Sequence, residues 1–133
     1  MDEKTLTTLE FDKILARVAK HTSFPAGRDL ALALRPSADY DEVVRRQRLT
    51  AEARHLHEMK PRTGLGGVHD VRALANKANL GGILEPSELL DIATPLEAGR
   101  ELKGTLTRLS GPLPLLAELA AQISDLDDVA ADI

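Results

Sequence analysis

The chain has 133 residues and a formal net charge of −4, which fits one domain or one lobe of a larger domain and excludes a uniformly basic nucleic-acid trap. It contains no cysteine and only two phenylalanines and one tyrosine, which excludes disulfides and thiolate metal sites and disfavours base stacking. Because the sequence opens Met1-Asp2-Glu3-Lys4 and has no run of about 18 apolar residues, we expect no signal peptide, no membrane span and a cytoplasmic location.

The first part of the chain predicts three helices. Residues 11–19 place apolar side chains at the i, i+3, i+4, i+7, i+8 spacing of a helix that buries one face. A second helix is predicted over residues 23–35, with a proline in its first turn and another just after its end. Asp39 and Glu42 have the spacing of a capping box and predict a third helix that runs to about Met59.

Two glycine-rich turns follow. The first covers residues 63–70, and Asp70 at its end is suited to cap a short helix over residues 71–78. The second covers residues 80–85. Both turns precede a predicted helix, but one such echo is too short to indicate a solenoid repeat.

The last part of the chain predicts further helices. Pro86 stands at the first position of a long one, where proline is favoured. Pro95 lies inside that helix and removes one hydrogen bond, so we expect a kink or a break over residues 91–95. Another helix follows over residues 113–123, and Asp125 is suited to cap one more. We expect additional helices beyond Ile133.

The sequence predicts an all-α protein, an irregular bundle of about six to seven helices. No run of four or more alternating β-branched residues is present. We expect one helical domain or fragment over residues 1–133. Within it, residues 1–62 form a basic-leaning half of three helices, residues 63–85 a glycine-turn segment with a short helix, and residues 86–133 an acidic helical half.

Charge is distributed unevenly along the chain. Residues 1–62 carry 12 basic against 10 acidic residues, whereas residues 63–133 carry 5 against 11. The first half is therefore the part suited to face phosphate. The candidate nucleic-acid-binding residues are Arg45, Arg46 and Arg48. A solvated helix face is the alternative, because Asp41 and Glu42 precede two of these arginines by four residues and are placed to pair with them.

The residues contain no complete catalytic or cofactor motif. No P-loop sequence occurs, the first glycine turn lacks a preceding strand, and no histidine lies in an H-E-x-x-H motif. The pair His69-Asp70 has the chemistry of a general base and its orienting carboxylate. The other interpretation makes Asp70 an N-cap. We expect no catalytic residue, metal or cofactor in these residues.

Four segments, in this order, carry a resemblance to a known family. They read Thr5-Leu6-x-x-Leu9-Glu10-Phe11-Asp12-Lys13-Ile14-Leu15, Gly27-Arg28-x-Leu30-Ala31-x-x-Leu34-x-Pro36, Leu65-Gly66-Gly67-Val68-His69-Asp70-Val71-Arg72 and Leu80-Gly81-Gly82-Ile83-Leu84-Glu85-Pro86-x-Glu88-Leu89-Leu90-Asp91-Ile92. Together they resemble the N-terminal region of the second bacterial MutS-like family, MutS-two, up to about residue 110. The matching turn residues, interpreted as structural, are Gly66, Gly67, His69, Asp70, Arg72, Gly81 and Gly82.

The resemblance implies a place at the start of a MutS-like core and lever region. The parent protein would lack the mismatch-reading domains of MutS and would carry an ABC-type ATPase that uses ATP and Mg²⁺, usually with a C-terminal Smr endonuclease domain. It would be a homodimer that clamps DNA or a stalled ribosome with its rRNA, and the family is credited with recombination suppression and ribosome quality control. These residues would then be a non-catalytic module that couples ATPase state to clamping.

Two other functions stay open. One is a helical protein-interaction or dimerisation domain without a nucleic-acid role. The other is a small hydrolase centred on His69 and Asp70.

Overall fold

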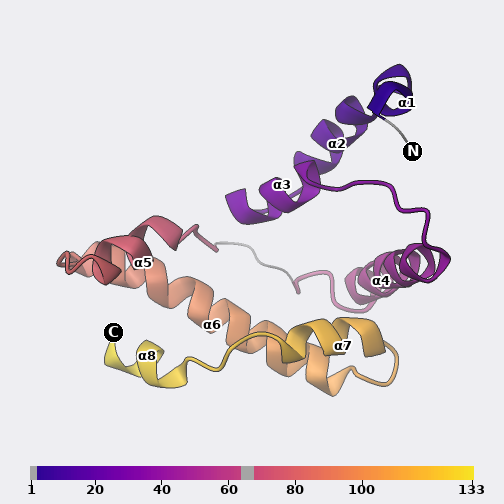
Figure 1. The fold of residues 1–133 in the computed structure, drawn as a ribbon. Helices are drawn as coiled ribbons and strands as arrows, with labels where there is room; N and C mark the ends of the chain where they lie inside the picture. Colours follow the sequence, from indigo (N-terminus) through magenta and orange to yellow (C-terminus); the bar gives the residue numbers. More distant parts are fainter. Residues whose placement is uncertain (1–2, 64–67) are drawn as a thin grey trace. The chain divides into compact units, whose positions relative to one another are not determined.

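The computed structural model describes residues 3–63 and 68–133, and helices are the only regular secondary structure in this part of the chain (Figure 1). The predicted all-α class is therefore confirmed, with eight helices in the described ranges against the six to seven expected. The helices are α1 (Glu3–Thr8), α2 (Phe11–Ala19), α3 (Pro25–Leu32), α4 (Tyr40–Met59), α5 (Arg72–Asn79), α6 (Pro86–Arg108), α7 (Pro114–Ala121) and α8 (Asp127–Asp132).

Internal contacts divide the chain into two compact units, residues 1–47 and residues 48–133. Helix α4 begins in the first unit and ends in the second. The three compositional segments expected from the sequence stay a prediction.

The first unit is built on α2, which contacts both α1 and α3. Its buried apolar residues come from all three helices, and they are Leu6, Leu15, Ala19 and Ala31. Helix α2 has the bounds that its apolar spacing predicts. Helix α1 was not predicted, because six residues with one buried apolar side chain give no readable periodicity. The two helices are joined at Glu10, a non-glycine residue with a left-handed φ of 52°.

The second unit has its core between α6 and α7. Leu113 is completely buried, and Leu106 and Ala120 are nearly so. Five partly buried apolar residues pack against these three, and they are Leu56, Leu102, Leu109, Leu116 and Ile123. Leu56 lies on α4, so the second half of that helix belongs to this core. Helix α8 also contacts α6.

Helix α6 runs without a break from Pro86 to Arg108. Of the kink or break predicted over residues 91–95, the break is therefore wrong, and the kink stays a prediction. A proline costs its helix one backbone hydrogen bond. Contacts of α6 with α7 and α8 support it, and tertiary packing supplies most helix stability in proteins. The Thr94 hydroxyl also donates to the carbonyl oxygen of Leu90 at 3.1 Å, next to the proline.

The final helices differ slightly from their predicted bounds. Helix α7 ends at Ala121, two residues before the expected end. Helix α8 begins only at Asp127, and no side chain caps it, so the predicted Asp125 cap is wrong. The exposed Asp125 carboxylate lies instead 3.9 Å from the ammonium of the partly buried Lys103 of α6, with which it forms an ion pair.

Candidate nucleic-acid interface

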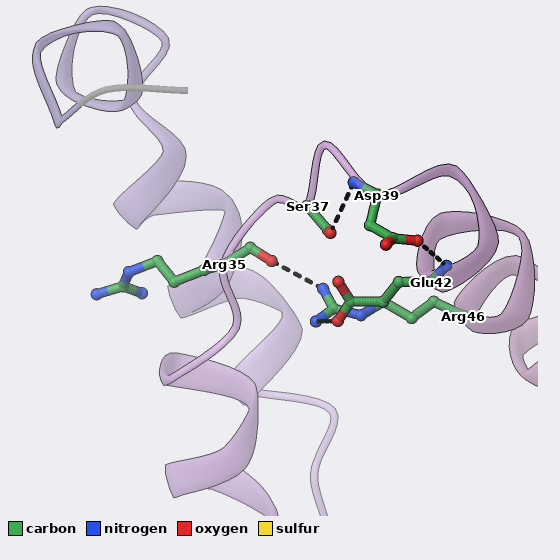
Figure 2. A network of polar contacts seen from close by, with 5 residues as sticks. All are labelled: Arg35, Ser37, Asp39, Glu42 and Arg46. Atoms are coloured by element: carbon green, nitrogen blue, oxygen red, sulfur yellow. Dashed lines mark hydrogen bonds and ion pairs between the residues drawn. The ribbon is translucent and has the colours of Figure 1, made fainter.

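Arg46 belongs to a polar network that holds the start of α4 to the loop before it (Figure 2). One guanidinium nitrogen donates to the carbonyl oxygen of Arg35 at 2.8 Å, and another pairs with the Glu42 carboxylate one turn earlier. The predicted Glu42–Arg46 pair is thus confirmed. Both side chains are about half exposed, so the pair has a structural use while its charge stays accessible to solvent.

The same network caps α4. The Asp39 carboxylate accepts from the Glu42 amide at 2.9 Å, as the capping box predicts. Ser37 completes the cap, because its hydroxyl oxygen accepts from the Asp39 amide at 3.2 Å. Glu42 does not take that amide in the described contacts, since its carboxylate faces Arg46. The cap therefore combines three residues where the sequence indicated two.

Arg45 and Arg48, the other two candidate cations, are exposed on α4. Arg45 and Arg46 belong to the first unit and Arg48 to the second. Arg45 takes part in further polar contacts. A role of the three arginines in binding nucleic acid stays a prediction.

Asp70 of the first glycine turn forms its hydrogen bonds with Arg72 and not with His69. Its carboxylate accepts from the Arg72 guanidinium at 2.5–3.1 Å and from the Arg72 amide, the first of α5, at 3.1 Å. These hydrogen bonds, the side-chain ones first, lower the pKa of Asp70 from 3.8 to about 2. Within the described ranges no hydrogen bond joins Asp70 to the exposed His69. The carboxylate thus orients Arg72 at the start of α5. The N-cap position of that helix is Val71, which has no side-chain cap, so the predicted Asp70 N-cap is wrong. The predicted motif residues Gly66 and Gly67 lie outside the described residues.

The second glycine turn ends α5 in a Schellman motif. The Gly81 amide donates to the carbonyl oxygen of Ala78, and the Gly82 amide to that of Lys77, both at 2.9 Å. Gly81 has a φ of 80°, which only glycine adopts readily. A Cβ on Gly82 would lie 2.8 Å from the Lys77 Cγ and 2.9 Å from its backbone oxygen. A side chain is therefore disfavoured at Gly81 by the backbone conformation and at Gly82 by the lack of space.

The elbow between α5 and α6, residues 77–88, is closed by an ion pair. The Lys77 ammonium lies 2.7 and 2.9 Å from the two carboxylate oxygens of Glu88. The same Glu88 carboxylate accepts from the Glu85 amide at 2.7 Å and so caps α6. Hydrogen bonds from Lys77 and then Glu85 lower the pKa of Glu88. One carboxylate therefore fixes the start of α6 and ties it to the end of α5.

Glu52 of α4 caps another helix from a distance. Its carboxylate accepts from the amides of Leu115 and Leu116 at 3.2 and 2.8 Å, in the first turn of α7. The N-cap position of α7 is the apolar Leu113, which offers no side-chain acceptor. The sequence contained half of this signal, a helix that begins with a proline after a residue unable to cap it. It could not indicate which distant acid supplies the oxygens.

The second unit also contains a basic groove that sequence reasoning missed, here called the α6 groove. It has a volume of about 900 Å³ and lies between α6 and the segment that follows α4. Its lining residues are Lys60, Pro61, Arg62, Thr63, Ala98, Glu101, Leu102, Thr105 and Arg108. The cations come from parts of the chain more than 40 positions apart, so no local charge pattern pointed to them.

Among the described residues, no three histidine or acidic side chains come together in an arrangement that would hold a metal ion. None of the described helices is both long and apolar enough to cross a bilayer.

Comparison with known proteins found similar chains along the full length of this one. Proteins called Endonuclease MutS2 are 41% identical over 133 residues in Symbiobacterium thermophilum and 37% identical over 136 residues in Bacillus cytotoxicus and in Bacillus cereus strain Q1. Each match covers 100% of this chain and 17% of the relative. The chain thus spans about one sixth of the length of these relatives. No family profile matches it.

Proposed function

We propose that this chain, which belongs to the MutS2 family as the N-terminal region of a member, is a non-catalytic helical module. It couples the ATPase state of its parent protein to the clamping of nucleic acid or a ribosome. DNA or a ribosome is then the partner of the parent protein, a homodimer, and the place of action is the cytoplasm. Recombination suppression and ribosome rescue are the two tasks that such a clamp would serve.

The elbow between α5 and α6 is the observation that supports this role most directly. A module that transmits a change of state needs stiff junctions between its helices. Here the Schellman turn at Gly81 and Gly82 fixes how α5 ends, and the Lys77–Glu88 pair ties that end to the cap of α6. The charged groups of this segment are thus engaged in joining helices.

ATP, Mg²⁺ and any nuclease centre belong, in this proposal, to the remainder of the parent. The sequence has no P-loop to cradle phosphates, and the described residues offer no cluster of metal ligands. The relatives are named endonucleases, so the parent is proposed to have endonuclease activity beside the ATPase that the family resemblance implies.

The first experiment measures ATP hydrolysis and DNA cleavage by the 133-residue chain and by its full-length parent. We expect the chain to do neither and the parent at least to hydrolyse ATP. In the parent, Lys77→Gln loosens the elbow. It should lower the stimulation of ATP hydrolysis by nucleic acid or ribosomes while the basal rate stays unchanged.

The matched control is Lys13→Gln, which removes the same charge from a pair that spans only three residues within the first unit. It should leave both rates unchanged. ATP turnover by the isolated chain, or equal stimulation of the Lys77→Gln and Lys13→Gln parents, would overturn the proposal.

A second candidate function is a protein-interaction or dimerisation domain. Helices α2 and α3 expose large apolar side chains, with Ile14 51% and Leu30 72% accessible, and such residues favour contact with another protein surface. Light scattering of the isolated chain separates the two functions. A stable dimer favours the second, and a monomer the first.

A further inference from the structure

The α6 groove gathers positive charge inside an acidic unit. Residues 48–133 carry 9 basic and 13 acidic residues. Elsewhere in the unit, four cations face acids, in the pairs Arg72–Asp70, Lys77–Glu88, Arg100–Asp127 and Lys103–Asp125. In the described part of the chain, by contrast, no ion pair joins Lys60, Arg62 or Arg108 to an acid. Three such cations lining one hollow are available to an anionic ligand.

The composition of the groove indicates the kind of anion. Two arginines and a lysine are the side chains that bind phosphate oxygens best. Glu101 is the only acid in the lining, so the groove carries a surplus of two positive charges. The nine lining residues include no aromatic side chain on which a base would stack. A ligand would therefore be held by its charged backbone and not by its bases.

The lining of the groove favours a polymer. Its volume of about 900 Å³ lies within the span of ligand sites, roughly 300–1,000 Å³, so the choice of ligand rests on the lining. Pockets for small molecules are lined mainly by apolar and aromatic groups, whereas four of the nine residues that line this one are charged and none is aromatic. Several cations spread along one hollow match the repeated charges of a phosphodiester chain.

We propose that the α6 groove binds the phosphodiester backbone of a nucleic-acid duplex through Lys60, Arg62 and Arg108. This inference rests on the proposed function and names the surface of this chain that meets the nucleic acid. Binding is independent of sequence, because backbone contacts carry no base information. It is weak, because only three cations take part in a chain whose net charge is −4.

Counterion release sets the expected numbers. Three phosphate contacts give a slope of about −2.7 for log affinity against log salt on duplex DNA. Affinity should then fall about 40-fold between 50 and 200 mM salt. Loss of one cation should reduce the slope to about −1.8 and weaken binding about tenfold at 50 mM salt.

The test is fluorescence anisotropy of the full 133-residue chain with labelled duplexes of DNA and of RNA, in a salt series. The variants are Arg62→Gln and Arg108→Gln, and their circular dichroism should match that of the wild type because both residues are exposed. Arg100→Gln is the matched control, since it removes the same charge from α6 at a position that does not line the groove. Glu101→Gln should tighten binding.

The outcomes separate the possibilities. Weaker binding and a smaller salt slope for both groove variants, with binding by Arg100→Gln unchanged, support the proposal. The duplex that binds more tightly then identifies DNA or RNA as the ligand. Binding by the groove variants equal to that of Arg100→Gln, or no binding at 50 mM salt, overturns it. Displacement of both duplexes by polyglutamate at equal charge concentration also overturns it, in favour of an acidic protein partner. The ATPase comparison of Lys77→Gln is independent of these results, so either proposal can fail alone.

Discussion

At the scale of single residues, Gly81 is the position where backbone geometry decides the residue type. Gly81→Ala should lower the free energy of unfolding by about 1–2 kcal/mol, because a Cβ at a φ of 80° meets the adjacent carbonyl oxygen. Gly111→Ala is the control, since that glycine has open space around it and no left-handed φ, and it should change stability by less than about 0.5 kcal/mol. Urea denaturation of both variants measures the difference, and equal effects would contradict the prediction.

Asp70 makes a second residue-scale prediction, on pH. Its pKa is about 2 in the folded chain against an ordinary 3.8, so folding favours the ionised form. The resulting stabilisation is complete above about pH 5 and is lost as the pH falls through 4 towards 2. Asp70→Asn removes this titration. The melting temperature of the variant should lie below that of the wild type by a constant amount from pH 7 to 5.

Below pH 4 the two melting temperatures should converge. Comparing wild type with variant cancels other titrating groups such as Glu88, whose pKa is also lowered. A difference in melting temperature that stays constant down to pH 2 would show that Asp70 is not held by Arg72 in solution.

The sequence predicted residue roles well where the cause was local. The Asp39 cap, the Glu42–Arg46 pair and the use of glycine at Gly81 all depend on neighbours within five positions. The candidate site was less readable. Lys60 and Arg62 line the same groove as Arg108 although they precede it by more than 40 positions, and no spacing rule predicts that arrangement.

At the scale of elements, α7 depends on an acid from another helix. Glu52→Ala leaves the amides of Leu115 and Leu116 without their acceptor and should cost about 1 kcal/mol. Glu52→Gln should cost less, because its amide oxygen still accepts. Hydrogen exchange at the two amides should speed up in Glu52→Ala. Glu58→Ala, which replaces an exposed acid on the same helix, is the control. Identical exchange rates in the two alanine variants would show that Glu52 does not cap α7.

Helix prediction succeeded or failed for identifiable physical reasons. Strong apolar spacing gave α2 its bounds, and a proline at the first helical position gave the start of α6. Helix α1 was missed because it is short. The break at Pro95 was predicted from a local cost that tertiary contacts of α6 outweigh. Local signals thus located most helices, while their continuity depended on packing.

At the scale of the whole molecule, many large apolar side chains of the described residues are exposed to solvent, and few are buried. In the first unit Ile14 and Val18, one turn apart on α2, are 51% and 43% exposed, whereas Leu15 between them is 7% exposed. The chain corresponds to 17% of the length of its relatives. We therefore expect the rest of the longer polypeptide to cover this face of α2.

Paired substitutions at adjacent positions test that expectation. In the 133-residue chain, Ile14→Asp should change stability by less than about 0.5 kcal/mol, since the side chain already meets water. Leu15→Asp should unfold the first unit, because it buries an unpaired charge. In the full-length parent, Ile14→Asp should instead lower the melting temperature clearly. If the parent tolerates Ile14→Asp as well as the isolated chain does, this face of α2 stays open in the complete protein. It would then be available to a separate partner.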